Sequence, residues 1–437
     1  MPDLQTLTTA DLRQYRTRAH ERYDAFRARG LSLNLGRGKP SPEQLDLSNS
    51  LLGVLAPGDV FAADGSDCRN YGGLQGLPEA RALFGQMLGV PPERLIVAGN
   101  SSLELMHDTV EWACLRGVPG GAAPWSASKP PAFLCPVPGY DRHFTICEGF
   151  GISMIPVPLT GHGPDMDVVE SLVASDPAIK GIWCVPKYSN PTGEVYSMEV
   201  TERLAKMRAA APDFRIFWDN AYAVHHLTSR HHDIADIFGL SERHGHADRV
   251  LMYASTSKMT FAGAGVAMVA SSPSNVKWLL LQMERRTIGS DKLNQLSHVR
   301  FLENVEGISS LMDAHAACLR PKFLAVGETL DRLLWGSGVA AWTHPEGGYF
   351  VSFDVLDGCA HRVVELAKAA GITVVPAGST FPHGKDPRDR NIRIAPSFPS
   401  LCEVTQAAEG LALSTLVAAS EAILAQRGDL ATSTAAR

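Results

Sequence analysis

The sequence predicts an α/β protein: a three-layer αβα sandwich around a mostly parallel seven-stranded sheet, with a smaller α+β domain. Seven short apolar runs between residues 94 and 270 alternate with stretches of helical periodicity. Most of these runs are continuously apolar, as expected for strands that are covered on both faces. Strands that alternate with helices form a parallel sheet with helices packed on its two sides.

Along the chain, residues 9–30 predict an amphipathic helix that ends at Gly30, and frequent Gly and Pro make 31–50 extended and loop-like. A second helix is expected from about Leu77, because Pro78 suits a first helical turn. The candidate strands are 94–98, 132–135, 152–158, 181–185, 214–218, 250–254 and 265–270. Residues 117–131, rich in Gly, Pro and Ser, are expected to form a surface loop.

The C-terminal part contains two further strand patterns, GGYFVSFDV and GITVVPA, with a helix between them and an Ala/Leu-rich helix after them. We expect residues 1–50 to pack with this smaller domain, 51–312 to form the large domain and 313–437 the small one. The last residues, RGDLATSTAAR, have little to bury and are expected to fray.

Composition excludes several classes of protein. The chain has 437 residues, 45% of them hydrophobic, and a net charge of −6, so nucleic acid or an anionic membrane is not an expected partner. Eight scattered cysteines without a CxxC pair argue against a disulfide scaffold or a metal site. No secretory signal or membrane-spanning run is visible, so we expect a cytoplasmic protein.

Polar side chains follow five of the predicted strands, at the edge where open α/β sheets bind ligands. Taken alone, each has an ordinary structural explanation. A lysine is usually a solvated surface residue, and the runs GNSS (99–102), NPTG (190–193) and DNAY (219–222) are also typical of helix caps and turns. The residues are Asn100, Ser101 and Ser102, then Tyr140, Asn190, Asp219 and Tyr222, and finally Ser255, Ser257 and Lys258.

Together these residues meet the chemical needs of pyridoxal 5′-phosphate. Lys258 provides an amine for a Schiff base, and Asp219 a carboxylate for the pyridine nitrogen. Tyr222 and Asn190 suit the ring 3′-oxygen, and Tyr140 suits the ring face. For the phosphate, a helix N-terminus at residues 100–102 is available, with Ser255 and Ser257 beside it.

The order AGNSS, PVPGY, SNPTG, DNAY and STSK resembles fold-type-I, class I aminotransferases of the aspartate aminotransferase kind, over residues ~31–400. The resemblance implies a homodimer in which Tyr71 reaches the phosphate of the neighbouring subunit's cofactor. It also implies that Arg393 binds the substrate α-carboxylate and that Gly36 or Gly38 approaches the substrate closely. The segment FAGAGV is similar to a divergent, MocR-like branch, whose regulators carry an N-terminal DNA-binding domain. Because the sequence starts almost directly with the aminotransferase part, we do not expect a DNA-binding role.

The implied reaction is a ping-pong transamination, with aspartate and 2-oxoglutarate favoured by the branch. Arg393 would grip the carboxylate bidentately while Lys258 moves the proton. His143 either lies behind Asp219 and supports its charge or has no role.

One position departs from the family pattern: Val266 stands where an arginine usually binds the phosphate. Ser101, Ser102, Ser255, Ser257 and Thr260, or a cation of the partner chain, are possible substitutes. A distal carboxylate needs a second cation, for which the candidates are Arg37, Lys39, Arg69, Arg142, Arg286 and Lys292. Lys292 and Asn294 are the preferred contacts across a subunit boundary.

The same set of candidate residues is compatible with two other functions. A lyase of the same fold would release pyruvate and ammonia without a keto-acid acceptor, whereas a transaminase would convert 2-oxoglutarate to glutamate. A non-catalytic module that binds the cofactor would need a partner domain, and the full set of candidate residues weighs against it.

Overall fold

The computed structural model describes residues 1–127 and 129–428. The expected surface loop at 117–131 lacks one described position, residue 128. The expected fraying covers 427–437, of which 429–437 lie outside the described residues, whereas Arg427 donates to the carbonyls of Gln5 and Leu7.

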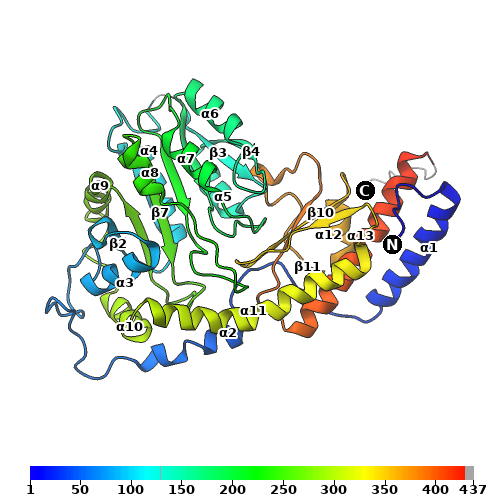
Figure 1. Ribbon diagram of the computed structural model, residues 1–437, viewed down its shortest axis with the longest axis horizontal. Coiled ribbons are helices and arrows are strands. Elements are labelled where there is room, and N and C mark those ends of the chain that lie inside the picture. Colours follow the sequence, from blue (N-terminus) through cyan, green and yellow to red (C-terminus); the bar gives the residue numbers. More distant parts are fainter. Residues whose placement is uncertain (128, 429–437) are drawn as a thin grey trace.

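A seven-stranded sheet, as predicted, forms the middle layer of the larger part of the molecule, on the left in Figure 1. Its order is β2-β8-β7-β6-β5-β3-β4, and every neighbouring pair is parallel except those of β8. Each predicted run overlaps one strand with ends shifted by at most two residues. The strands are β2 (Leu95–Val97), β3 (Ala132–Val137), β4 (Ser153–Pro158), β5 (Ile179–Cys184), β6 (Arg215–Asp219), β7 (Val250–Ser255) and β8 (Ala267–Ser271).

Helices cover both faces of this sheet, which gives the predicted three layers. Successive residues of a strand point to opposite faces, so Phe217 joins one apolar core while Ile216 and Trp218 join the other. One face packs against α3 (Pro78–Leu88), α6 (Met166–Ser175), α7 (Met198–Lys206), α8 (Ile237–Arg243) and α10 (Lys292–Leu302). The other face packs against α4 (Ser102–Arg116), α5 (Asp141–Gly149) and α9 (Pro273–Met283).

The N-terminal and C-terminal segments share a separate apolar core. The packing is close: a Cβ on Gly410 would lie 2.4 Å from Phe26. The elements are α1 (Thr9–Arg27), β1 (Leu33–Asn34), β9 (Ala340–Trp342), β10 (Val351–Val355), α12 (Ala360–Ala369), β11 (Ile372–Thr373), β12 (Asn391–Ile394) and α13 (Leu401–Gln426). The short helix α2 (Pro42–Asp46) follows β1, and its buried residue is Gln44. Short 3₁₀ helices occur at Asn49–Gly53, Pro92–Arg94, Ala247–Arg249 and Pro382–Gly384.

The two strands expected in the C-terminal part do not pair with each other. β10 has β9 on one edge and β12 on the other, both antiparallel, so neither edge is open to β11. β11 instead pairs in parallel with β1 from the N-terminal segment, Leu33 opposite Ile372.

Helix α11 (Val305–Leu334) runs along both parts of the molecule (Figure 1). Its first turns place Ile308 and Met312 in a core of the large sheet. Its later turns, from Leu319 onward, belong to the core of the terminal segments. Pro321 lies inside the helix, near the passage from one core to the other.

Among the described residues, α13 is the one helix that is long and apolar enough to cross a membrane, with a mean hydropathy of 1.4 over its most apolar window. That window is 83% buried within the molecule, which is the usual position of a core helix.

Candidate active site

A cavity of about 430 Å³ lies at the carboxyl ends of the central strands, bordered by the N-terminal segment and by β12. It gathers residues from both parts of the molecule. The predicted site residues that line it are Gly36, Gly38, Ser102, Tyr140, Asn190, Asp219, Tyr222, Lys258 and Arg393.

Lys258 follows the end of β7 and faces two aromatic rings. Its Nζ lies 4.9 Å from the ring centre of Tyr222 and 6.0 Å from that of Tyr349. Burial lowers the pKa of Lys258 below its ordinary value, and the attraction of Asp219 opposes this shift in part. The lower pKa enlarges the fraction of neutral amine, which is the form that attacks a carbonyl carbon.

Asp219 ends β6 and is 3% exposed. Its Oδ2 accepts a hydrogen bond from Nε2 of His143 at 3.0 Å, so this nitrogen carries a proton. The ring of His143 is buried and stacks on Trp183 at a centroid distance of 4.4 Å. Oδ1 of Asp219 is also buried, yet it has no hydrogen-bond partner among the described residues. A buried carboxylate oxygen without a donor is costly, and a protonated ring nitrogen in the cavity would satisfy it.

Two tyrosines and an amide complete the walls around this carboxylate. Burial, the largest cause, raises the pKa of Tyr222 and of Tyr140, so both phenols stay protonated and can donate hydrogen bonds. Tyr140 precedes the first residue of α5, and Asn190 is 3% exposed.

The N-terminus of α4 meets a cluster of hydroxyl groups. Ser101 caps the helix by accepting a backbone N–H, and Ser102 reaches the cavity. Ser255 donates to Ser257 at 3.1 Å, and Ser257 donates to the carbonyl of Asn100 at 3.3 Å. Free N–H groups and the positive end of the helix dipole make such a terminus suitable for a phosphate group.

Val266 lies in the apolar core, 1% exposed, and its N–H donates to Oγ1 of Thr256 at 2.9 Å. The expectation that Thr260 supplies a phosphate donor is wrong. Its hydroxyl is fully buried and is already bonded to Thr256 and to Nε2 of His298.

Arg393 points from β12 toward the cavity and is 6% exposed. Its NH1 donates to Oδ1 of Asp141 at 3.0 Å and to Oδ1 of Asn190 at 3.4 Å. The guanidinium lies 4.8 Å from the ring centre of Phe350. The same ring would be only 2.3 Å from a Cβ on Gly38, so this position accepts glycine alone.

The six cations proposed for a distal carboxylate separate into two groups. Arg37, Lys39 and Arg142 line the cavity. The other three, which do not line it, are bound elsewhere: Arg69 by Asp67, Arg286 by Glu104 and Asp108, and Lys292 by the carbonyls of Asn70 and Gly72.

Of the two preferred contacts across a subunit boundary, Lys292 is not available for that role. Lys292 is 5% exposed, and its ammonium is used within its own chain. The amide of Asn294 donates to the carbonyls of Ala264 and Gly265. By contrast, Tyr71 is 83% exposed and lies outside the cavity of its own chain.

A buried polar network beneath Lys258 was not anticipated from the sequence. Nε2 of His315 lies 2.8 Å from the carbonyl of Met259 and must donate to it, so Nδ1 is an acceptor. Gln44 donates to that Nδ1 and to the hydroxyl of Tyr349, both at 3.0 Å. Tyr349 in turn donates to the carbonyl of Lys258 at 3.3 Å. The network therefore joins α2, α11 and the turn that positions Lys258.

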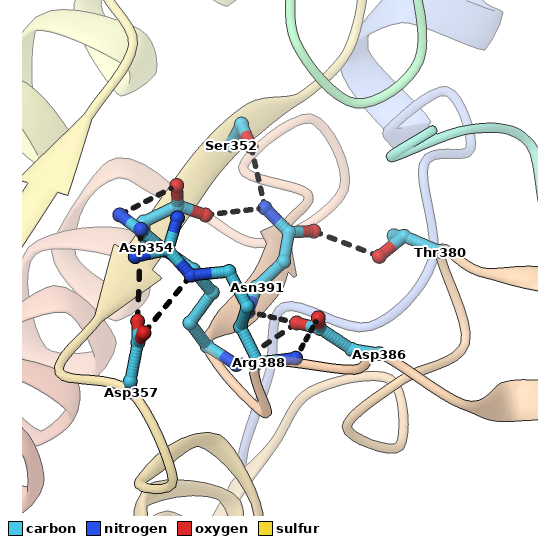
Figure 2. Close-up of polar contacts among 8 residues, drawn as sticks. Ser352, Asp354, Asp357, Thr380, Asp386, Arg388 and Asn391 are labelled. Atoms are coloured by element: carbon cyan, nitrogen blue, oxygen red, sulfur yellow. Dashed lines mark hydrogen bonds and ion pairs between the residues drawn. The ribbon is translucent and has the colours of Figure 1, made fainter. Parts of the chain in front are cut away.

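A second network surrounds Asn391 (Figure 2), which lies on β12, the strand that also carries Arg393. The amide of Asn391 donates to Oγ of Ser352 at 2.8 Å and to Oδ1 of Asp354 at 2.7 Å. Its oxygen accepts from Thr380 at 2.8 Å, and its backbone N–H donates to Asp386. Asn391 thus has partners on β10 and on the loop before β12.

This second network also reaches the large sheet, because the carbonyl of Thr380 accepts the N–H of Gly139 at 2.7 Å. Gly139 precedes Tyr140, and Asn391 lies two residues before Arg393. The contact links the loop of the aromatic residue to the strand of the arginine.

Comparisons with known proteins agree with this geometry. Residues 7–427 match the family model described as aspartate amino-transferase. A Corynebacterium glutamicum protein named aspartate aminotransferase is 48% identical over 400 residues, which are 92% of this chain and 92% of that protein. A crystal structure of an aspartate transaminase from the same species has a TM-score of 0.95 at 46% identity, covering 96% of this chain and 99% of that one. A Thermus thermophilus α-aminoadipate aminotransferase, complexed with N-(5′-phosphopyridoxyl)-L-leucine, shares the fold, with a TM-score of 0.72 at 21% identity, covering 94% and 98%. The chain is an aminotransferase of fold type I and belongs to the aspartate aminotransferase family.

Proposed function

We propose that this aminotransferase uses pyridoxal 5′-phosphate to move an amino group from aspartate to 2-oxoglutarate by a ping-pong mechanism. The observation that carries the proposal is the buried, unpartnered Oδ1 of Asp219 in the cavity that Lys258 and Arg393 also line. When bound, the cofactor supplies a carbonyl for the substrate amine and a ring that accepts electrons from the substrate Cα.

Each residue then has a defined task. Lys258 would hold the cofactor through a Schiff base and, once released, its Nζ would take the proton from the substrate Cα. Asp219, supported by His143, would keep a proton on the ring nitrogen. Tyr222 and Asn190 would donate to the ring oxygen.

The ring face and the phosphate would be bound by the remaining predicted residues. Tyr140 would stack on the ring. The donors for the phosphate would be Asn100, Ser101, Ser102, Ser255 and Ser257, together with Tyr71 of the partner subunit.

The charges of the cavity support a dicarboxylate substrate. Besides Lys258, four cationic side chains line it against two carboxylates, an excess that suits a phosphate group and a doubly charged amino acid. Arg393 would bind the α-carboxylate, and Arg37, Lys39 or Arg142 could reach a distal one. The name of the relative that is 48% identical supports aspartate.

We also propose a cytoplasmic homodimer. An aromatic side chain as exposed as Tyr71, outside the cavity of its own chain, supports a role in a neighbouring site. Light scattering should give twice the mass of one chain, and a monomer at working concentration would contradict this part.

A half-reaction tests the function. Protein loaded with pyridoxal phosphate is mixed with single amino acids, and the bound cofactor's absorbance should bleach fastest with aspartate and recover with 2-oxoglutarate. Borohydride reduction should fix a pyridoxyl mass on the peptide that contains Lys258 in the wild type and in the control variant Lys277→Ala. Label on another lysine, or release of pyruvate and ammonia without an acceptor, would refute the assignment.

A further inference from the structure

The arginine proposed to bind the substrate carboxylate already has a carboxylate against it. NH1 of Arg393 donates to Oδ1 of Asp141 at 3.0 Å, and the two residues come from opposite sides of the cavity, β12 and the first turn of α5. The side chain of Arg393 is 7% exposed and that of Asp141 is 33% exposed. Asp141 thus forms an ion pair with a nearly buried guanidinium while its own carboxylate stays accessible to water.

The pair balances a charge that is otherwise costly. A guanidinium removed from water and left without a counter-ion is strongly unfavourable, and Asp141 supplies that counter-ion when no substrate is present. A substrate carboxylate on the same guanidinium would bring two negative charges close together in a poorly solvated site, which is also unfavourable.

Asp141 has a favourable alternative position. As the first residue of α5 it lies at the positive end of the helix dipole, which stabilises a carboxylate there. Arg393 has less freedom, because its side chain is nearly buried, also donates to Asn190 at 3.4 Å and lies 4.8 Å from the ring centre of Phe350. Of the two partners, the aspartate is the one that can leave.

We propose that Asp141 is an internal competitor for Arg393, displaced by the α-carboxylate of the substrate, and that it sets how tightly carboxylates bind. The inference rests on the proposed role of Arg393. Because amino-acid donors and keto-acid acceptors share that carboxylate, Asp141 must weaken both to the same degree and leave the choice of side chain unchanged.

Asp141→Asn tests the inference, because the amide oxygen can still accept from Arg393 while the charge is lost. We expect the KM for aspartate and for 2-oxoglutarate to fall by a common factor of about ten, equivalent to about 1.4 kcal/mol, with kcat little changed. Asp141→Glu, which keeps the charge, should stay near the wild type. The matched control is Asp167→Asn, in the first turn of α6, where an exposed aspartate pairs with Arg203 outside the cavity; it should change nothing.

Titration calorimetry with maleate, a dicarboxylate that cannot react, gives a readout independent of turnover. Asp141→Asn should bind maleate about tenfold more tightly than the wild type. Unchanged or weaker binding would overturn the inference, as would a KM that falls for only one substrate. If the wild type fails the half-reaction with every amino acid while the maleate result holds, the proposed function fails and the competition at Arg393 stands.

Discussion

Replacing Gln44 by leucine should destabilise the protein through the network beneath Lys258. Gln44 is fully buried, and its amide has three partners: the N–H of Ser41 at 3.1 Å, Nδ1 of His315 at 3.0 Å and the hydroxyl of Tyr349 at 3.0 Å. Leucine has a similar volume but can make none of these bonds. Tyr349 keeps its bond to the carbonyl of Lys258, so the groups left without a partner are the N–H of Ser41 and Nδ1 of His315. A buried polar group left without its partner costs about 1–3 kcal/mol, so these two together predict a loss of at least about 2 kcal/mol.

Urea unfolding followed by tryptophan fluorescence measures this loss, because the free energy of unfolding falls linearly with urea concentration. Gln86→Leu is the control, since it makes the same chemical change at an exposed position of α3 and should shift the free energy by less than about 0.5 kcal/mol. A loss below about 1 kcal/mol for Gln44→Leu, or one equal to the control, would show that the network contributes little to stability.

Two other substitutions have outcomes set by burial. Asn391→Leu should lower the free energy of unfolding in urea by about 2–3 kcal/mol, because it leaves buried polar groups without a partner. Arg388→Ala is the comparison: it breaks an ion pair with Asp357 whose side chains are 60% and 53% exposed, so it should lower that free energy by less than about 1 kcal/mol. Equal losses would contradict the role given to the network in Figure 2. Burial raises the pKa of Glu194 to about 8 from its ordinary value of 4.5. Between these two pH values the folded protein holds a proton that the unfolded chain has released. The free energy of unfolding should therefore fall as the pH rises through this range. Glu194→Gln should reduce the fall in the urea midpoint between pH 5 and pH 9, and an unchanged fall would rule out Glu194 as its source.

The sequence predicted best those site residues that lie at the ends of strands. Lys258 and Asp219 each lie at or just after a continuous apolar run, and parallel strands bring such ends to one edge. The strand pattern and the parallel topology were therefore sufficient to predict that Lys258 and Asp219 lie in one cavity. The pairing of His143 with Asp219 was one of two alternatives, and only the distance decided it.

Contacts between distant segments could not be predicted in this way. Asp141 and Arg393 lie 252 positions apart, and Gln44 and His315 lie 271 apart, with no periodicity that relates them. Lys292 appeared free in the sequence because the carbonyls that bind it come from a loop more than 200 positions earlier.

The path of α11 limits how the two sides of the cavity can move. Proline cannot donate the backbone hydrogen bond that closes a helical turn, so the helix lacks one such bond at Pro321, and we expect any bend to pivot there. The first turns, with Ile308 and Met312, are held by one core, and the turns from Leu319 onward are held by the other. A tilt of about 5° at this pivot would carry the far end of the helix, about 20 Å away, by less than about 2 Å. As one element shared by both cores, the helix therefore couples the core that contains β12, the strand of Arg393, to the core of the large sheet.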